Sequence, residues 1–116
     1  MPTLARVEDN VYVCGQLQEA DFADLARQGV KTIVNNRPDG EEATQLPHAR
    51  AAELAAQHGL EYHFIPVGRD PLTLEMVDRF ADILAQSPRP VVAYCRSGAR
   101  SSTLHSYARA RRLEQR

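Results

Sequence analysis

The chain has 116 residues, of which 43% are hydrophobic and 25% are charged, as is usual for a soluble globular domain. This length predicts one domain over residues 1–116, with a core that needs neither a disulfide nor a metal. The formal net charge of −1 gives no reason to expect a nucleic acid or an anionic membrane as a partner. No apolar segment resembles a signal sequence or a membrane span, so we expect a cytoplasmic protein with Cys14 and Cys95 as free thiols.

Short apolar strands alternate with amphipathic helices along the whole chain. The strands are runs rich in β-branched and aromatic residues, and they are predicted over residues 10–14, 30–34, 60–65 and 91–94. The helices carry apolar side chains three or four residues apart, and they are predicted over residues 18–28, 46–58, 73–84 and 101–107. Thr73 is the expected cap of the third helix, and Ser101 or Ser102 that of the last. The arginines of the 108–116 tail fit a helix end, where they complement the dipole.

This alternation predicts the α/β class: a small, mainly parallel four-stranded sheet between two layers of helices. Ligands of such sheets bind beyond the carboxyl ends of the strands. Four segments directly follow strands and should therefore gather at one rim: Cys14, the polar loop 35–42, the loop 67–71 and Cys95. The four histidines show no metal-ligand spacing, and no cofactor is expected.

The strongest chemical signal is the segment after the last strand, where Cys95 opens a polar loop. The loop runs through Arg96, Ser97, Gly98, Ala99, Arg100 and Ser101. Gly98 tolerates a positive φ, and such a loop at the start of a helix turns its backbone N–H groups inward as an anion cradle. The N–H groups, the helix dipole and two arginines favour the Cys95 thiolate, which a nucleophile needs near neutral pH. Arg100 can hold an oxyanion with its planar fork.

This loop resembles the active-site loop of single-domain rhodaneses, which are sulfurtransferases that carry a persulfide on the cysteine. It also resembles the phosphate loop of cysteine-dependent protein phosphatases. The phosphatase pattern has five residues between Cys and Arg, whereas four separate Cys95 from Arg100 and Ser101 takes the phosphatase arginine position. Tyr94 stands where phosphatases usually have a His. A smaller ring suits a terminal sulfur or a small sulfur oxyanion better than a tetrahedral phosphoryl group.

Four segments together resemble a bacterial phosphatase-like domain family whose members occur alone or fused to metallo-β-lactamase-type hydrolases and persulfide dioxygenases. These segments are residues 15–17, 34–41, 65–67 and 93–101. The resemblance implies a dual-specificity-phosphatase-like, three-layer αβα fold that carries a rhodanese-like loop. It also implies Cys95 as nucleophile, Arg100 as anion-binding residue, and a second rim motif of Arg37, Asp39 and Glu41. A persulfide dioxygenase or another metallo-β-lactamase-fold protein is the partner that it suggests.

The main functional hypothesis is a sulfurtransferase. Cys95 would take a sulfane sulfur from thiosulfate or a low-molecular-weight persulfide and pass it to a thiol or cyanide, without a general acid. The alternative is a protein phosphatase that forms a phosphocysteine and needs an acid, with Asp70 as the first candidate and Asp39 as the second. The least favoured hypothesis is a non-catalytic module that binds anions without reactivity at Cys95.

Two side chains have alternative interpretations. We expect Arg37 to pair with Glu41 or Asp39 and so to shape the rim, and the alternative is that it reaches toward an anionic substrate. Cys14 departs from the family pattern, in which a small residue such as Ser more often precedes the Gly-Gln pair. If the first strand neighbours the fourth, as the phosphatase-like fold implies, Cys14 could resolve a persulfide or a sulfenic acid on Cys95. The alternative is that Cys14 is a small packing thiol.

Overall fold

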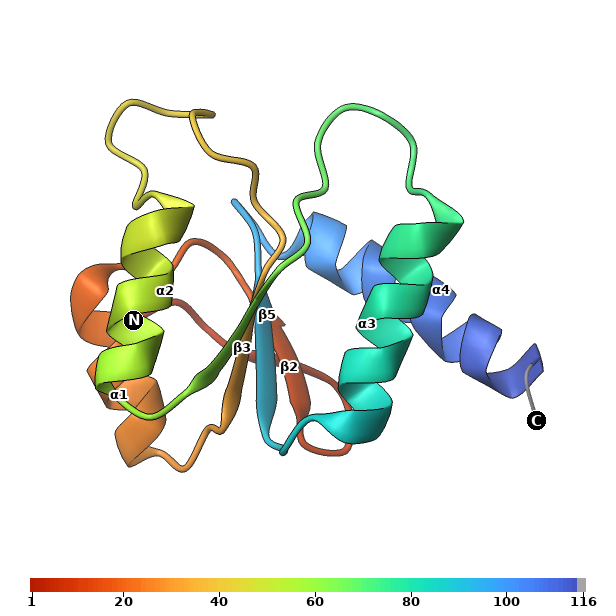
Figure 1. The fold of residues 1–116 in the computed structure, drawn as a ribbon, viewed down its shortest axis with the longest axis horizontal. Coiled ribbons are helices and arrows are strands. Elements are labelled where there is room, and N and C mark those ends of the chain that lie inside the picture. The colour runs from red at the N-terminus through yellow and green to blue at the C-terminus, as the bar shows by residue number, and fades with distance from the viewer. Residues whose placement is uncertain (115–116) are drawn as a thin grey trace.

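The computed structural model describes residues 1–114 and shows a five-stranded sheet between two pairs of helices (Figure 1). The strands are β1 (Ala5–Glu8), β2 (Val11–Cys14), β3 (Thr32–Asn35), β4 (Glu61–Phe64) and β5 (Val91–Tyr94). The helices are α1 (Glu19–Arg27), α2 (His48–Gln57), α3 (Leu74–Gln86) and α4 (Ala99–Glu114). None of these helices is long and apolar enough to cross a membrane.

The two faces of the sheet bury separate apolar clusters, because successive side chains of a strand point to opposite faces. In β5, Val92 and Tyr94 pack into the cluster under α1 and α2, whereas Val91 and Ala93 pack into the cluster under α3 and α4. Large side chains such as Phe80 are fully buried, which stabilises the fold by about 1.5–3 kcal/mol for each. Figure 1 shows α1 and α2 on one side of the sheet and α3 and α4 on the other. The predicted three-layer α/β architecture is therefore confirmed.

Two details of the prediction were wrong. The four predicted strands correspond to β2–β5, but the sheet has a fifth strand, β1, which pairs antiparallel with β2 and makes the sheet mixed. This edge strand has only one partly buried apolar side chain, Val7, so it shows no alternating pattern in the sequence. The last helix begins at Ala99, so Ser101 and Ser102 lie inside its first turn and do not cap it.

The strand order β1-β2-β5-β3-β4 places β5 at the centre of the sheet, with β2 and β3 as parallel neighbours. The last residues of β2 and β3, Cys14 and Asn35, both lie opposite Tyr94 in β5. The expected neighbourhood of the first and fourth predicted strands is thus observed. Since three parallel strands end side by side, the segments that follow them meet at the carboxyl end of β5, where Figure 1 shows the long loops after β3 and β4.

Candidate active site

Cys95 is the first residue after β5, and the loop that follows it closes directly on its sulfur. The backbone N–H of Gly98 donates to Cys95 Sγ at 3.1 Å. Gly98 has a φ of 95°, in the left-handed region that favours glycine. A Cβ at this position would also lie 3.3 Å from the carbonyl carbon and oxygen of Cys14. The tight turn therefore requires glycine, and it holds the loop against the end of β2.

The surroundings of Cys95 favour its thiolate, as the sequence predicts. Burial alone would raise the pKa of the thiol, because the side chain is excluded from water. The backbone N–H groups of Ser101, Ser97 and Gly98 act in the opposite direction, and the net result is a Cys95 pKa below its usual value. The cradle thus offers an activated sulfur nucleophile at the start of α4.

A buried hydrogen-bond chain fixes the first turn of α4 to the loops after β3 and β4. The Ser101 hydroxyl donates to Asn36 Oδ1 at 2.8 Å, and Asn36 Nδ2 donates to the carbonyl oxygen of Ile65 at 3.0 Å. A hydroxyl has a single proton, so in this arrangement Ser101 gives it to Asn36 and not to Cys95. The thiolate is consequently stabilised by main-chain donors, whose positions are set by the fold.

Arg100 reaches from the first turn of α4 to the loop after β3. Its Nη1 and Nη2 donate to the two carboxylate oxygens of Glu41 at 2.7 and 2.8 Å. Nη1 also donates to the carbonyl oxygen of Val67 at 2.7 Å. The hydrogen bonds to Glu41 raise the pKa of Arg100, which keeps its positive charge beside the Cys95 loop.

Arg37 forms the second layer of this ionic network and is only 3% exposed. It donates to Glu41 Oε1, Glu42 Oε1 and Gln16 Oε1, each at 2.9 Å. Of the two interpretations of Arg37, the structure shows the pairing with Glu41, not with Asp39. Hydrogen bonds from Arg100, and then from Arg37, lower the pKa of Glu41 to about 2, although its partial burial acts to raise it. Glu41 is therefore an anion that joins two arginines at the rim.

The Cys95 loop has a further ionic contact with the β3 loop, since Arg96 Nε lies 3.1 Å from Glu42 Oε1. Arg37, Arg96 and Arg100 are thus each paired with Glu41 or Glu42. An incoming anion meets a rim whose charges are largely balanced.

The two acid candidates are not part of this network. Asp39 Oδ1 accepts a hydrogen bond from the backbone N–H of His48 at 2.7 Å, so Asp39 stabilises the N-terminus of α2. Asp70 is exposed on the loop after β4, and within residues 1–114 it makes no ion pair or side-chain hydrogen bond. Within residues 1–114, neither carboxylate forms a hydrogen bond or an ion pair with a residue of the Cys95 loop.

The main chain of Cys14 contacts that of Cys95, but the Cys14 side chain faces the core. Its side chain belongs to the cluster under α1 and α2, together with Tyr94, and its carbonyl oxygen accepts from the Cys95 N–H at 3.3 Å. Burial, with further contributions from Cys95 and Asp21, raises the pKa of Cys14 to about 12. These features suit a packing thiol, and a resolving role for Cys14 stays a prediction.

Four residues that hold the site together received no individual role from the sequence: Gln16, Asn36, Glu42 and the main chain of Val67. The loops 35–42 and 67–71 were expected at the rim because they follow strands, but the partners of these residues are far apart in the sequence. Within residues 1–114, no three His, Cys, Asp or Glu side chains are grouped closely enough to hold a metal ion.

A cysteine whose thiolate is favoured, between a central parallel strand and a helix in this three-layer fold, is the arrangement of a cysteine-phosphatase-like domain. Comparison with known proteins assigns this chain to one family within that class. The chain belongs to the family described as the phosphatase-like domain of β-lactamase hydrolase-like proteins, whose model matches residues 3–112. The family resemblance inferred from the motifs is thereby confirmed.

Curated relatives of this chain are β-lactamase hydrolase-like proteins. It is 37% identical over 100 residues to that of Agrobacterium fabrum (strain C58) and 31% identical over 100 residues to that of Xylella fastidiosa (strain Temecula1). Each alignment covers 86% of this chain but only 23% of the relative. The chain therefore spans about a quarter of the length of these relatives.

Solved structures with the same fold carry phosphatase names. A candidate phosphatase from Neisseria meningitidis is 36% identical, with 90% of this chain and 75% of that chain covered and a TM-score of 0.81. The core catalytic domain of the PP-IP phosphatase SIW14 from S. cerevisiae is 14% identical, with 84% and 58% covered and a TM-score of 0.65. TpbA from P. aeruginosa, solved with phosphotyrosine, is 21% identical, with 82% and 54% covered and a TM-score of 0.59. The last two show a shared fold.

Proposed function

We propose that this domain is a thiol-dependent sulfurtransferase in which Cys95 carries a persulfide. The thiolate attacks the outer sulfur of thiosulfate, so that an S–S bond forms to Cys95 while the bond to the sulfonate breaks and sulfite leaves with the electron pair. A thiolate or cyanide then attacks the outer sulfur of the persulfide, which regenerates the Cys95 thiolate and releases a new persulfide or thiocyanate. Both leaving groups are stable anions, so neither step needs a general acid.

The observation that supports this proposal is the short ring between Cys95 and Arg100. With four residues between them, the loop brings the N–H of Gly98 to 3.1 Å from Sγ itself. A donor at this distance stabilises the Cys95 thiolate, which both attacks and leaves in sulfur transfer. A phosphoryl group needs donors around three oxygens beyond the sulfur, which calls for a wider ring.

The placement of the carboxylates supports the same proposal. A phosphatase must protonate an alkoxide or phenoxide leaving group, and an acid for this purpose has to reach that oxygen. Asp39 is bonded to the backbone of His48, and Asp70 is exposed on its loop. Sulfur transfer does not require either side chain.

The second candidate is a cysteine-dependent phosphatase. The names of the similar solved structures favour this reaction over sulfur transfer, and none of those named above is a sulfurtransferase. In this candidate Cys95 forms a phosphocysteine, Arg100 turns from Glu41 to the phosphoryl oxygens, and Asp70 moves with its loop to protonate the leaving group. The unpaired state of Asp70 among the described residues leaves it free for that role.

The proposed substrate is a small sulfur-containing anion or a persulfide in the cytoplasm. As a partner we propose a metallo-β-lactamase-fold protein such as a persulfide dioxygenase, which would share the persulfide substrate. The β-lactamase hydrolase-like names of the longer relatives support this choice.

The test is direct measurement of the sulfur adduct. Reduced protein is incubated with thiosulfate or glutathione persulfide, desalted and analysed by intact mass, beside Cys95→Ser, Arg100→Ala and the matched thiol variant Cys14→Ser. The proposal predicts a gain of one sulfur atom in the wild type and in Cys14→Ser, no gain in Cys95→Ser, and loss of the added sulfur on treatment with cyanide.

Absence of an adduct in the wild type would contradict the proposal. Hydrolysis of an aryl phosphate that is lost in Cys95→Ser and Asp70→Asn would then establish the phosphatase. If neither reaction occurs, while sulfate or phosphate still binds in an Arg100-dependent manner, the domain is an anion-binding module.

A further inference from the structure

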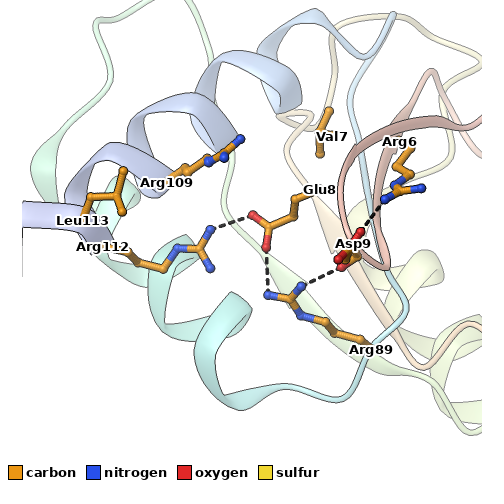
Figure 2. A pocket seen from close by; sticks show the side chains of 8 residues that line it. All are labelled: Arg6, Val7, Glu8, Asp9, Arg89, Arg109, Arg112 and Leu113. Carbon is orange, nitrogen blue, oxygen red and sulfur yellow. Dashed lines mark hydrogen bonds and ion pairs between the residues drawn. The ribbon is translucent and has the colours of Figure 1, made fainter. Parts of the chain in front are cut away.

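A charged cavity lies at the opposite end of β5 from Cys95. It has a volume of about 820 Å³ and opens between β1, the segment before β5 and the last turns of α4. Its walls, drawn in Figure 2, are formed by Arg6, Val7, Glu8, Asp9, Arg89, Arg109, Arg112 and Leu113. Arg89 precedes β5 whereas Cys95 follows it, so the length of this strand separates the cavity from the candidate active site.

Glu8 is the anionic centre of the cavity, but its charge is already engaged. It accepts hydrogen bonds from Arg112 Nη2 at 2.6 Å and from His105 Nε2 at 2.7 Å, and Arg89 Nη2 lies 3.0 Å away. Burial acts to raise its pKa, but the hydrogen bonds from Arg112 and His105 dominate and lower the pKa to about 2. Glu8 therefore stays ionised at neutral pH, and both of its carboxylate oxygens already have partners within the protein.

The cavity nevertheless retains an excess of positive charge. Four arginines face two carboxylates, Glu8 and Asp9, so the lining has a formal charge of +2. Arg6 is paired with Asp9, and Arg89 also donates to the carbonyl oxygens of Asp9 at 2.6 Å and Leu84 at 3.1 Å. Arg89 and Arg112 share the one charge of Glu8, and Arg109 has no carboxylate partner within residues 1–114, so the excess charge is spread over these three arginines. Two of the three, Arg109 and Arg112, lie on α4.

These two arginines have unused donors. Arg112 Nε is buried and has no hydrogen-bond partner among the residues that the structure describes. The Arg109 side chain is exposed, and within residues 1–114 it makes neither an ion pair nor a hydrogen bond. The two residues are three apart on α4, so they lie on one face of the helix, as Figure 2 shows. The helix dipole explains positive side chains at this helix end, but it explains neither a buried unpaired donor nor a cavity around it.

We propose that this cavity binds a small organic polyanion, which carries phosphate or carboxylate groups, with Arg109 and Arg112 as its principal contacts. Guanidinium groups bind the oxygens of both kinds of group through paired hydrogen bonds, and Arg109, which has no partner within residues 1–114, is free to make them. The volume falls in the range of pockets for small organic ligands. Val7 and Leu113 add apolar surface for the carbon skeleton, which favours an organic anion over a bare inorganic ion.

The experiment is calorimetric titration of the full chain with glucose 1,6-bisphosphate and, separately, with citrate, which distinguishes phosphate from carboxylate ligands. The variants are Arg109→Glu, which changes an unpaired side chain, and Arg112→Lys, which keeps the charge for Glu8 but removes the planar guanidinium. Arg27→Ala removes an exposed arginine elsewhere and serves as the control, and Arg100→Ala removes the arginine of the Cys95 site. Urea unfolding of each variant shows that it is folded.

The proposal predicts that at least one of the two probes binds at millimolar concentration or below. Arg109→Glu should weaken this binding tenfold or more and Arg112→Lys severalfold, while Arg27→Ala and Arg100→Ala leave it unchanged. Failure of both probes to bind would overturn the proposal. Binding that is equal in Arg109→Glu and wild type, or lost in Arg100→Ala alone, would also overturn it and would assign the anion to another place.

Discussion

Replacing Gly98 by alanine should impair the cradle around Cys95 while the rest of the fold remains. Gly98 has a φ of 95°, and a side chain in this left-handed conformation costs about 1–2 kcal/mol. The new Cβ would also lie 3.3 Å from the backbone of Cys14, so the loop or the end of β2 must shift by a few tenths of an ångström. This shift, together with any change of φ that relieves the strain, weakens the hydrogen bond that the Gly98 N–H donates to Sγ at 3.1 Å.

Weakening of that hydrogen bond should raise the pKa of Cys95. A whole hydrogen bond to a charged acceptor contributes about 1.5–3 kcal/mol, and 1.36 kcal/mol corresponds to one pKa unit, so the rise should not exceed roughly 1–2 units. The assay is the pH dependence of alkylation by iodoacetamide, with the site identified by peptide mass. Because only the thiolate reacts, the midpoint of the profile for Gly98→Ala should move to higher pH.

Gly59→Ala is the matched control. Gly59 has a φ of 69°, and a Cβ there would meet nothing within 4 Å, so the variant has the backbone strain without the loop displacement. Both variants should unfold at lower urea concentration than the wild type, but only Gly98→Ala should change the Cys95 profile. An unchanged midpoint in folded Gly98→Ala, or an equal shift in Gly59→Ala, would refute the reasoning.

Three further predictions concern the rim and the core beside it. Glu41→Gln should lower the free energy of unfolding at pH 7 by about 1–2 kcal/mol, since Glu41 is partly exposed, whereas Glu53→Gln at an exposed pair should change it little. Because the pKa of Glu41 is lowered from 4.5 to about 2, this stabilisation is present above pH 4.5 and is lost as the pH falls toward 2; urea midpoints that differ equally at pH 7 and pH 2 would contradict this. Asn36→Ala should cost about 2–3 kcal/mol in urea unfolding, because the buried Ile65 carbonyl and the Ser101 hydroxyl lose their partner, and a cost below 1 kcal/mol would be inconsistent with the network. Cys14→Ser should leave persulfide transfer unchanged; an intramolecular disulfide in the oxidised wild type, found by mass spectrometry, would instead support a resolving thiol.

The central part of the fold was predictable because its signals are local. Apolar runs bounded by Gly, Asn or Pro identify β2–β5, and the three-layer architecture follows from their alternation with amphipathic helices. The position of Cys95 at a strand end followed from the same pattern. Strand β1 was missed because it lies at an edge and buries little, so its stability comes from pairing with β2 and from the packing of Val7.

The partners within the site were less predictable, because they join segments that are distant in the sequence. The rim motif could be recognised as a group, but nothing local indicates that Glu41 holds both Arg100 and Arg37. Likewise, Ser101 looks like a helix cap in the sequence, whereas its hydroxyl bonds Asn36 inside the first turn of α4. Such contacts depend on the order of strands in the sheet, which determines which loops meet.

The proposed sulfurtransferase activity requires that the short ring around Cys95 selects sulfur over phosphoryl chemistry. The most direct test measures two reactions of one protein sample, thiocyanate formation from thiosulfate and cyanide and phosphate release from p-nitrophenyl phosphate, with Cys95→Ser as the blank for both. We expect a higher kcat/KM for thiocyanate formation than for phosphate release, and we expect thiocyanate formation to be lost completely in Cys95→Ser. A Cys95-dependent kcat/KM that is higher for p-nitrophenyl phosphate would contradict it and identify the domain as a phosphatase.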